Sequence, residues 1–472
     1  MDELSGKNRI VINDKLFVAA LAIGAFIATM NMTNINIALP FIISDFQSDM
    51  ATIQWVVTGC MLTCGLIMPT IGYFMDRFGG RNLFLTGLLL LAGSSMLCAV
   101  SGSVAFLIGA RLLQGISIGI INTIPMAIVY QTLEPEKQLP AISVISMVLS
   151  VGVAMGPSVS GVFVDLWGWQ AIFLVNIPIA LLDAFLIYKF VPQKVMAASQ
   201  KLDVIGLTTS MVGTVGLLLG FSQGDTLGWT SPITIGILAV STVCLIFFVV
   251  FEIKKQNPML NFSVFLYKGF VFMFVLNAVS QMATNIAPMF MSLFLQNVSG
   301  YTATATGLAM IIPSLAMAVM APVAAKSKKH FSSRTIILVS MIALTFATWQ
   351  LSRFTVATTI IGFTIWMSLR YAGMGLMSPI ISNFAMSSVP VQLTGHASAM
   401  MNWSRQLLST ISMSLFSILY SNQLLMLSAT SVDMRIAEQQ AIGAVNGLSA
   451  FLVALTIPLI LFIKEEYSQR KA

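Results

Sequence analysis

The sequence predicts an all-α integral membrane protein with fourteen transmembrane helices. The chain is 57% hydrophobic and only 9% charged, with a mean hydropathy of +0.90, whereas a soluble domain carries about a quarter charged residues. Apolar stretches long enough to cross a bilayer recur along the whole chain, and about 20 residues are needed for one helical span. Because lipid cannot satisfy backbone polar groups, such stretches must form helices or a closed barrel.

The spans are separated by short loops. The first apolar stretch follows about 15 mixed-charge residues and contains Pro40, which favours a retained span over a cleaved signal peptide. We expect spans at 16–40, 51–73, 82–101, 104–130, 139–164, 170–190, 204–222, 231–252, 269–292, 304–325, 333–351, 355–384, 396–424 and 442–464.

Positive charges divide unequally between the two ends of these spans. With the N-terminus inside, nineteen Lys and Arg residues fall on cytoplasmic segments and two, Arg353 and Arg435, fall outside. Lys and Arg are enriched on the cytoplasmic side of membrane proteins, so both termini are expected there. The net charge of +7 is scattered through short loops, and we therefore expect no nucleic-acid partner.

Several function classes are excluded by the residues themselves. Cys60, Cys64, Cys98 and Cys244 all lie in apolar stretches, which predicts small buried hydrophobes and no disulfide or metal site. There is no Ser/His/Asp or Cys/His set, and His330 and His396 stand apart at loop edges. Without a phosphate-cradling motif, we expect no enzyme activity, no cofactor and no ATP.

A weak internal repeat divides the chain in two. An offset of about 259 residues aligns Arg111 with Arg370 and brings Asp76–Arg81 near Lys326–Arg334. This pattern indicates two six-span halves with spans 7 and 8 inserted between them. The expected divisions are a cytoplasmic N-terminus at 1–15, an N-terminal six-helix bundle at 16–192, two inserted helices with linkers at 193–268, a C-terminal six-helix bundle at 269–464 and a cytoplasmic tail at 465–472.

The stretch between spans 2 and 3 is a charged hinge of sequence Gly72-Tyr73-Phe74-Met75-Asp76-Arg77-Phe78-Gly79-Gly80-Arg81. Its glycines allow a sharp turn, and Asp76 can accept hydrogen bonds from backbone N–H groups or from an arginine. An ordinary positive-inside loop is the alternative. The spacing G-x-x-x-D-R-x-G-x-R resembles the cytoplasmic loop between spans 2 and 3 of the major facilitator superfamily. The resemblance implies a conformational hinge made by Gly72, Asp76, Arg77, Gly79 and Arg81.

Two further elements resemble the same superfamily. Arg111-Leu112-Leu113-Gln114-Gly115 in span 4 resembles its R-x-x-Q-G element, and a buried guanidinium must face the bundle interior. In span 5, Gly152, Gly156, Pro157 and Gly161 resemble the G-x-x-x-G-P-x-x-x-G element of its exporters. Small residues every four positions permit close helix contact, and a proline bends the helix, so this element is expected to shape alternating access.

Other stretches resemble the fourteen-span drug:proton antiporter branch in particular, and the resemblance runs from about residue 16 to residue 420. They are Asn36–Pro40, Trp55–Gly59, Phe173–Pro178, Gly228–Pro232 and Leu295–Gly300. The resemblance implies a monomeric exporter in a bacterial plasma membrane that moves lipophilic or amphiphilic compounds outward in exchange for protons. Two alternatives are a narrow-specificity exporter of a metabolite, siderophore or lipid precursor, and a membrane sensor or assembly factor that does not transport.

Proton coupling needs an ionisable group inside the membrane. The branch usually has an aspartate in span 1, five residues before the asparagine of N-x-A-L-P, and Asn31 stands there in this chain. Asp183 is the acid that lies well within a predicted span, so Asp183 and Arg111 are the proton-relay candidates. The alternative for Asp183 is a structural carboxylate that pairs with Lys189 or Arg111 or is reached by water.

Uncharged amides mark the candidate substrate cavity. Amides in a membrane interior either line a water-filled cavity or bond between helices. The candidates are Asn31, Asn34, Gln114, Asn277, Gln281, Asn285 and Arg370. With 31 Met and 31 Phe the chain can offer a permissive apolar surface, and its buried arginines favour neutral or anionic substrates.

Overall fold

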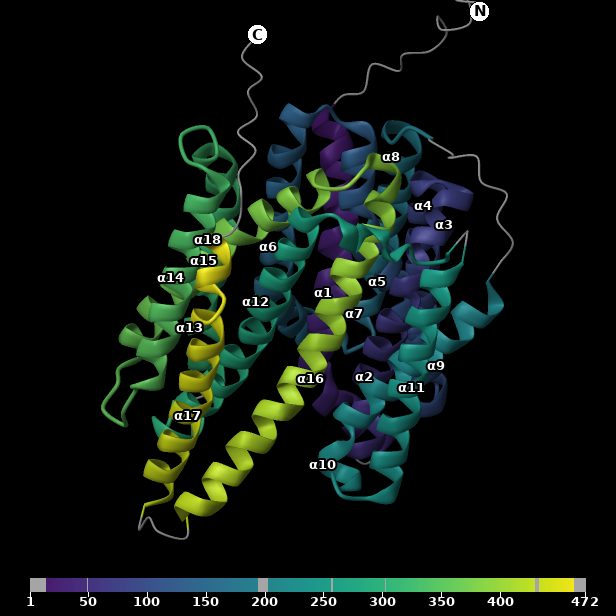
Figure 1. Cartoon of the computed structure of the whole chain (residues 1–472). Coiled ribbons are helices and arrows are strands. Elements are labelled where there is room, and N and C mark those ends of the chain that lie inside the picture. Colours follow the sequence, from purple (N-terminus) through teal and green to yellow (C-terminus); the bar gives the residue numbers. More distant parts are fainter. Residues whose placement is uncertain are drawn as a thin grey trace, which may run out of the picture.

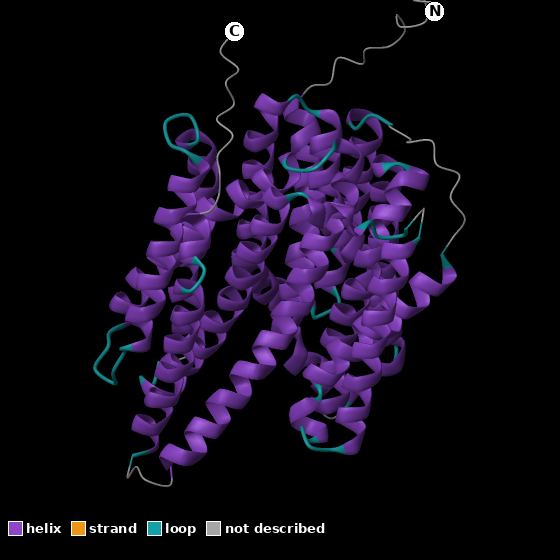
Figure 2. Cartoon of the chain, in the orientation of Figure 1, coloured by secondary structure: helices purple, strands orange, loops and turns teal. Residues whose placement is uncertain are grey.

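The protein is a bundle of long helices. A computed structural model describes residues 14–48, 50–193, 203–255, 258–301, 303–428 and 433–461, and no β-strand occurs within these ranges (Figure 2). The first part contains α1 (Asp14–Phe46), α2 (Met50–Ile67), η1 (Met68–Thr70), α3 (Ile71–Phe78), α4 (Gly80–Ala99), α5 (Val104–Thr132), α6 (Pro135–Trp167), α7 (Ala171–Leu174) and α8 (Asn176–Phe190).

An inserted segment and a second bundle follow. The inserted segment contains α9 (Val204–Ser222), α10 (Gly224–Leu227), α11 (Pro232–Lys254) and η2 (Phe262–Leu266). The second bundle contains α12 (Lys268–Leu293), η3 (Phe294–Val298), α13 (Ala303–Ser327), α14 (Ser333–Ser352), α15 (Ile360–Ser387), η4 (Val391–Leu393), α16 (Thr394–Ser428), α17 (Met434–Ala454) and α18 (Ile457–Leu461).

Helices occur at all fourteen expected spans. Thirteen of them, within the described ranges, are long and apolar enough to cross a membrane, and the expected span 139–164 lies in the continuous helix α6. Several expected boundaries were off by five residues or more: α1 ends at Phe46 instead of 40, and α3 ends at Phe78 instead of 73. Among the helix starts, α15 begins at Ile360 instead of 355, and α17 begins at Met434 instead of 442. In each case polar residues near the helix start, Thr359 and Asp433, accept a backbone N–H and fix the first turn.

Prolines explain where spans break into shorter helices. Proline has no N–H to continue the helical hydrogen-bond pattern. Pro69 lies at the start of η1, which separates α2 from α3, and Pro178 lies in the first turn of α8, just after the break from α7. Pro458 follows the break between α17 and α18 in the same way.

The two bundles repeat one packing scheme. In the first, α1 packs on α6, α2 on α5, and α4 on both α5 and α8. In the second, α12 packs on α16, α13 on α15, and α14 on both α15 and α17. These pairs correspond in chain order, as the internal repeat predicted. We propose that the bundles correspond to the divisions 16–192 and 269–464.

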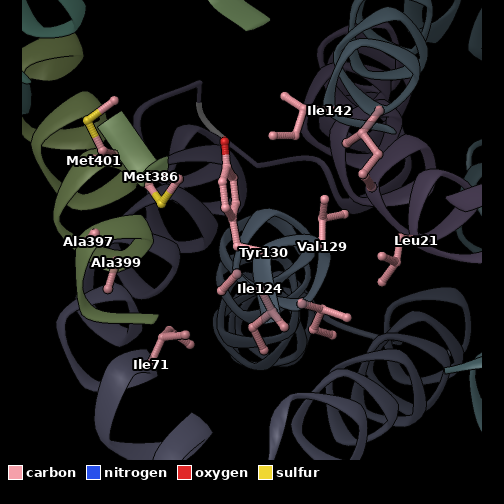
Figure 3. Packing of buried hydrophobic residues seen from close by; sticks show 14 of the residues in the cluster. Leu21, Ile71, Ile124, Val129, Tyr130, Ile142, Met386, Ala397, Ala399 and Met401 are labelled. Carbon is pink, nitrogen blue, oxygen red and sulfur yellow. The ribbon is translucent and has the colours of Figure 1, made fainter. Parts of the chain in front are cut away.

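The bundles meet at one end of the molecule and separate at the other. Figure 1 shows α3, α4 and α8 toward one end, and α10 with the far ends of α16 and α17 toward the other. We name these the α3 end and the α10 end. One apolar cluster at the α3 end joins side chains of both bundles, including Leu21, Ile71, Tyr130, Met386 and Ala397 (Figure 3). Toward the α10 end each bundle has an apolar cluster of its own.

The inserted helices attach beside the boundary between the bundles. Helix α9 packs on α11 and also contacts α2 and α16. Its hydrogen bonds go to α16: Trp403 Nε1 donates to Thr214 Oγ1 (3.0 Å), and Ser414 Oγ donates to the Phe221 carbonyl (2.6 Å). Apolar side chains of α11 remain exposed, as expected for a helix that faces lipid.

Candidate functional site

The buried guanidinium of Arg111 joins three helices of the first bundle. Arg111 is 1% exposed. It donates from Nε to the Val56 carbonyl (3.0 Å) on α2, and from one terminal nitrogen to Asn31 Oδ1 (2.8 Å) on α1 and Gln114 Oε1 (2.6 Å) on α5. All three acceptors are uncharged, so this cation is held by dipoles and not by a carboxylate.

Gln114 completes this network on the side of α4. Its Nε2 donates to Ser95 Oγ (2.8 Å), and Gln114 itself is fully buried. Gly115 follows at the tightest contact of α5 with α2, because a Cβ there would lie 2.2 Å from the Cys60 carbonyl oxygen. The R-x-x-Q-G element therefore builds the interior of the bundle.

Asn31 and Asn34 lie inside the first bundle. Asn31 is 2% exposed, and its Nδ2 has no hydrogen-bond partner among the described residues. Asn34 is 3% exposed and, with its amide nitrogen facing α6, donates to Ser160 Oγ (2.9 Å) and to the Gly156 carbonyl (3.0 Å). Both amides thus make contacts within or between helices of this bundle.

The glycines of α6 allow α1 to approach closely. A Cβ at Gly156 would lie 2.0 Å from Thr33 Oγ1, and one at Gly152 would lie 3.3 Å from the Phe26 carbonyl. The side chain of Pro157 and the surroundings of Gly161 lie outside the described residues, while the backbone of α6 is helical through both positions. Gly152 and Gly156 of span 5 are thus explained by the contact between α1 and α6.

Asp183 is a fully buried carboxyl group on α8. It is 0% exposed, and neither of its oxygens has a hydrogen-bond partner among the described residues. Its Oδ2 lies against α1, since a Cβ at Gly24 would be 2.7 Å away, and the Phe84 ring of α4 borders the same Gly24 position. Lys189 lies instead over the rings of Phe185 and Phe190, so the expected alternative of a Lys189 partner is not what the geometry shows.

Arg370 occupies the equivalent helix of the second bundle but has different surroundings. It is fully buried and donates from Nε to Thr348 Oγ1 (3.2 Å) on α14. Arg405 on α16 is half-buried and donates to Asn402 Oδ1 (2.8 Å), one turn before it. The repeat therefore preserves a buried guanidinium in each bundle and changes its partners.

The remaining cavity candidates lie on α12. Asn277 and Gln281 are half-buried, and the side chain of Asn285 lies outside the described residues. Ser280 between them is buried and lies against Met341 and Met377 of the second bundle. Among the amide candidates whose side chains are described, Asn277 and Gln281 are the ones that keep partial exposure.

The hinge stretch contacts the second bundle at the α3 end through His396, a residue that stands apart at a loop edge in the sequence. Asp76 Oδ2 on α3 lies 3.1 Å from His396 Nε2 in the first turn of α16. Gly72 makes room for the imidazole, because a Cβ there would lie 2.3 Å from His396 Nδ1. The two residues are 320 positions apart, and the usable signal was that both begin or end a span on the same predicted side. We call this contact the latch.

The other hinge residues make local contacts. Arg77 donates to the Tyr73 hydroxyl (2.7 Å), and Arg81 lies over the Tyr188 ring. Gly79 has a φ of 78°, which is unfavourable for other residues, and forms the turn between α3 and α4. Neither arginine bonds Asp76, so the partner of the acid comes from the other bundle.

Two more hydrogen bonds cross between the bundles near the latch. Ser398 Oγ donates to the Thr123 carbonyl (2.6 Å), and the Tyr130 hydroxyl lies 2.7 Å from both oxygens of Asn383. In Figure 3, Tyr130 stands among apolar side chains of both bundles. The α3 end is therefore closed by polar and apolar contacts together.

Comparison with known proteins agrees with this architecture. A sequence profile described as Major Facilitator Superfamily matches residues 21–413. The chain is 29% identical to the multidrug resistance protein Stp of Mycobacterium tuberculosis over 88% of this chain and 77% of that protein. It is 27% identical to the riboflavin transporter RibZ of Clostridioides difficile over 86% of this chain and 88% of that protein.

A solved structure has the same fold. The human organic anion transporter MFSD10 superimposes with a TM-score of 0.68, at 15% identity, over 95% of this chain and 99% of that chain. This likeness concerns the fold alone. The profile match over most of the chain, with the named relatives, shows that the protein is a multi-pass membrane transporter and not an enzyme, and that it belongs to the Major Facilitator Superfamily.

Proposed function

We propose that this transporter exports lipophilic or amphiphilic compounds by alternating access, in exchange for protons. The observation that carries the proposal is the unequal closure of the two ends: one shared apolar cluster with the latch at the α3 end, and separate clusters toward the α10 end. With the α3 end on the cytoplasmic side, as the charge distribution predicts, this is the outward-facing state of an exporter.

Similarity to named exporters supports the class of substrate. Stp is named a multidrug resistance protein, and a relative in Haemophilus influenzae is named a multidrug export protein. The buried cations of the interior, Arg111 and Arg370, make a dedicated polycation site unfavourable by like-charge repulsion. We therefore propose neutral or anionic lipophilic compounds as the preferred substrates.

Asp183 is the proposed proton carrier. A charged carboxylate without a partner is costly in an apolar interior, so in the outward-facing state the side chain holds its proton. It lies six residues before Lys189 on α8, about 9 Å along the helix axis. Opening of the α3 end would bring water to the carboxyl group and allow the proton to leave toward the cytoplasm.

The test measures efflux of a lipophilic anionic dye from cells, or its uptake into inside-out vesicles, with and without an imposed proton gradient. We expect gradient-driven efflux for the native chain and its loss in Asp183→Asn at equal membrane levels. Asp45→Asn is the matched control, because Asp45 lies at the α10 end and an amide oxygen there can still accept from Trp169 Nε1 (2.6 Å). Persistent gradient-driven efflux in Asp183→Asn would exclude Asp183 as the carrier.

A narrow-specificity exporter is the second candidate function. The observation that favours it is the similarity to RibZ, which is named for a single substrate. Under this alternative, a panel of unrelated lipophilic dyes gives no gradient-dependent efflux, while one metabolite competes at low concentration. Substrate binding without any flux would instead favour the sensor or assembly role.

A further inference from the structure

The segment that leads from the inserted helices to the second bundle crosses the closed α3 end. We call residues 258–267 the strap. Met259, Leu260 and Val264 are 0–1% exposed and belong to the apolar cluster that joins both bundles. Phe262 contacts the Phe248 ring of α11, and Phe265 contacts Phe270 and Phe274 of α12. Three apolar side chains of the strap are therefore part of the core, while Leu266 is exposed.

Two consecutive backbone N–H groups of the strap are held by side chains from different helices. Leu260 N donates to Glu252 Oε2 (3.1 Å) at the end of α11. Asn261 N donates to His396 Nδ1 (3.4 Å) on α16. Glu252 and His396 are 1% and 4% exposed, so these bonds are shielded from water.

The bond from the strap fixes the hydrogen-bonding state of the latch. Since Nδ1 of His396 accepts from Asn261, its hydrogen lies on Nε2, which then donates to Asp76. Gly72 leaves no free space beside the imidazole, because even a Cβ there would lie 2.9 Å from Cε1. Asn261 therefore sets which ring nitrogen faces the carboxylate and how the ring is turned.

Hydrogen bonds and a ring contact attach the strap and the inserted helices to α16. Helix α9 is hydrogen-bonded to α16 through Thr214 and Trp403, and the Phe248 ring of α11 contacts the same Trp403. When the bundles separate at the α3 end, the contact of His396 with Asp76 must break, while its contact with Asn261 can stay. The imidazole then keeps its orientation in the open state, so that Nε2 can donate to Asp76 again when the α3 end closes.

We propose that Glu252 and the Asn261 amide are positioning groups for the latch, and that through them the inserted helices stabilise the closed α3 end during transport. This inference rests on the proposed alternating access. It gives the inserted pair a role in the conformational equilibrium beyond enlarging the bundle. Asp76 and His396 make the contact, and the strap orients it.

The sharpest test removes one N–H group. Asn261 has φ −80°, which proline can adopt, so Asn261→Pro removes the donor to His396 at a φ that the ring allows. Asn261→Ala is the matched control: it loses the same side-chain contact with the Ser263 N–H but keeps the backbone donor. The two variants therefore differ in whether the backbone nitrogen of residue 261 can donate to His396 Nδ1.

The readout is the distance between the bundles at the α3 end. Spin labels are attached to Glu134→Cys, before α6, and Val391→Cys, before α16, both exposed positions, in a Cys244→Ala background. Double electron–electron resonance in lipid nanodiscs then gives the populations of short and long distances. We expect Asn261→Pro to raise the ratio of open to closed molecules by about three- to tenfold over Asn261→Ala, as loss of one net hydrogen bond predicts.

A second pair of variants tests the other attachment. Glu252→Leu removes the acceptor of the Leu260 N–H, whereas Glu252→Gln keeps an acceptor oxygen at that place. We expect the leucine variant to open the α3 end and the glutamine variant to resemble the native chain. Combining Glu252→Leu with Asn261→Pro should add little, because both act through the strap.

Equal distance distributions for Asn261→Pro and Asn261→Ala, or for Glu252→Leu and Glu252→Gln, would overturn the proposal. A fall in thermal stability without a change in populations would also overturn it, since that result indicates structural support alone. The populations are measured without any transported compound. A negative result in the export assays therefore does not affect this distance measurement. A negative result in the distance measurement does not affect the export proposal.

Discussion

Arg111 shows how a buried cation is accommodated without an acid. Its contacts are the Asn31 amide, the Gln114 amide and the Val56 carbonyl, each of which presents an oxygen. In this arrangement the Nδ2 group of Asn31 is buried and has no hydrogen-bond partner among the described residues. Asn31 Oδ1 therefore stabilises the guanidinium, while the unpaired Nδ2 of the same side chain is destabilising.

Replacing Asn31 by Asp should stabilise the protein. The change exchanges the unpaired donor for a second acceptor and places a carboxylate beside the guanidinium, 2.8 Å away at the present Oδ1. A charge-assisted hydrogen bond adds about 1–3 kcal/mol, so the unfolding midpoint in detergent should rise. Thermal unfolding followed by circular dichroism measures the shift.

Asn34→Asp is the control, three residues further along α1. Its amide nitrogen faces the Gly156 carbonyl and Ser160, so a carboxylate there loses a donor and meets an acceptor oxygen. We expect a loss of about 1–3 kcal/mol. An equal effect of both substitutions would show that the Arg111 network does not distinguish the two sites.

Residue identities predicted part of the site from the sequence. A guanidinium in an apolar stretch must face the interior, and Arg111 with Gln114 does so. For Asp76 and His396 the sequence indicated a shared side of the membrane but not their contact, because a single sequence does not show which spans 320 residues apart lie together. Asn31 and Asn34 could equally have faced a cavity, since an amide satisfied by a neighbouring helix has the same local pattern.

At the scale of helices, close contact between α2 and α5 depends on one glycine. In Gly115→Ala the new methyl group would lie 2.2 Å from the Cys60 carbonyl and 2.1 Å from Thr63 Oγ1. We expect a loss of about 2 kcal/mol or more, seen as lower yield and an earlier unfolding transition. Gly109→Ala on the same helix should be neutral or slightly stabilising, because nothing lies within 4 Å of its Cβ position.

The base of the inserted pair should respond to pH through Asp203. This residue caps α9 and forms an ion pair with Lys255 (2.7 Å). Burial alone would raise its pKa, but hydrogen bonds from Glu252, Lys255 and the Gly206 N–H outweigh burial, so the pKa of Asp203 is lowered. A lowered pKa gives stability that is present above the unfolded value of about 3.9 and is lost as the pH falls through the folded value.

Asp203→Asn tests this contribution because an amide oxygen can still cap the Gly206 N–H. We expect the unfolding midpoint of the variant to lie below that of the native chain at pH 7. This difference in midpoint should stay constant down to about pH 5 and begin to narrow near pH 4, where the unfolded chain takes up a proton. It should close at lower pH, where the native carboxyl of Asp203 is also protonated. If the two unfolding midpoints instead became equal near neutral pH, a group other than Asp203 would control the difference between them.

At the scale of the whole molecule, alternating access requires the α3 end to open in every cycle. A flexible, reducible cross-linker between Glu134→Cys and Val391→Cys, which lie on different bundles, should therefore stop export, and reduction should restore it. Linking Glu134→Cys to Phe78→Cys joins two exposed positions of one bundle and should leave export unchanged. Continued export across the first link would argue against movement of the bundles.

Most of the fold could be predicted because lipid imposes it. Each apolar stretch had to become a helix, and the charge of the loops then gave an orientation. The expected grouping of the spans into two six-helix halves came from the repeat and the family resemblance, not from periodicity, since spans buried on several sides carry no clear polar face. The place of α9 beside α2 and α16 could not be predicted, because its Thr214 and Phe221 contacts involve single hydrogen bonds to distant residues.

Those same contacts of α9 bear on how the chain is assembled during synthesis. Thr214 is synthesised 189 residues before its partner Trp403, and Phe221 is synthesised 193 residues before Ser414. At about 5–20 residues per second, the inserted helices remain in the membrane for roughly 10–40 s before their polar partners have been made. During that interval the first bundle can already have formed, so the inserted pair docks late, and a ribosome that stalls before α16 leaves a nascent chain with two undocked helices.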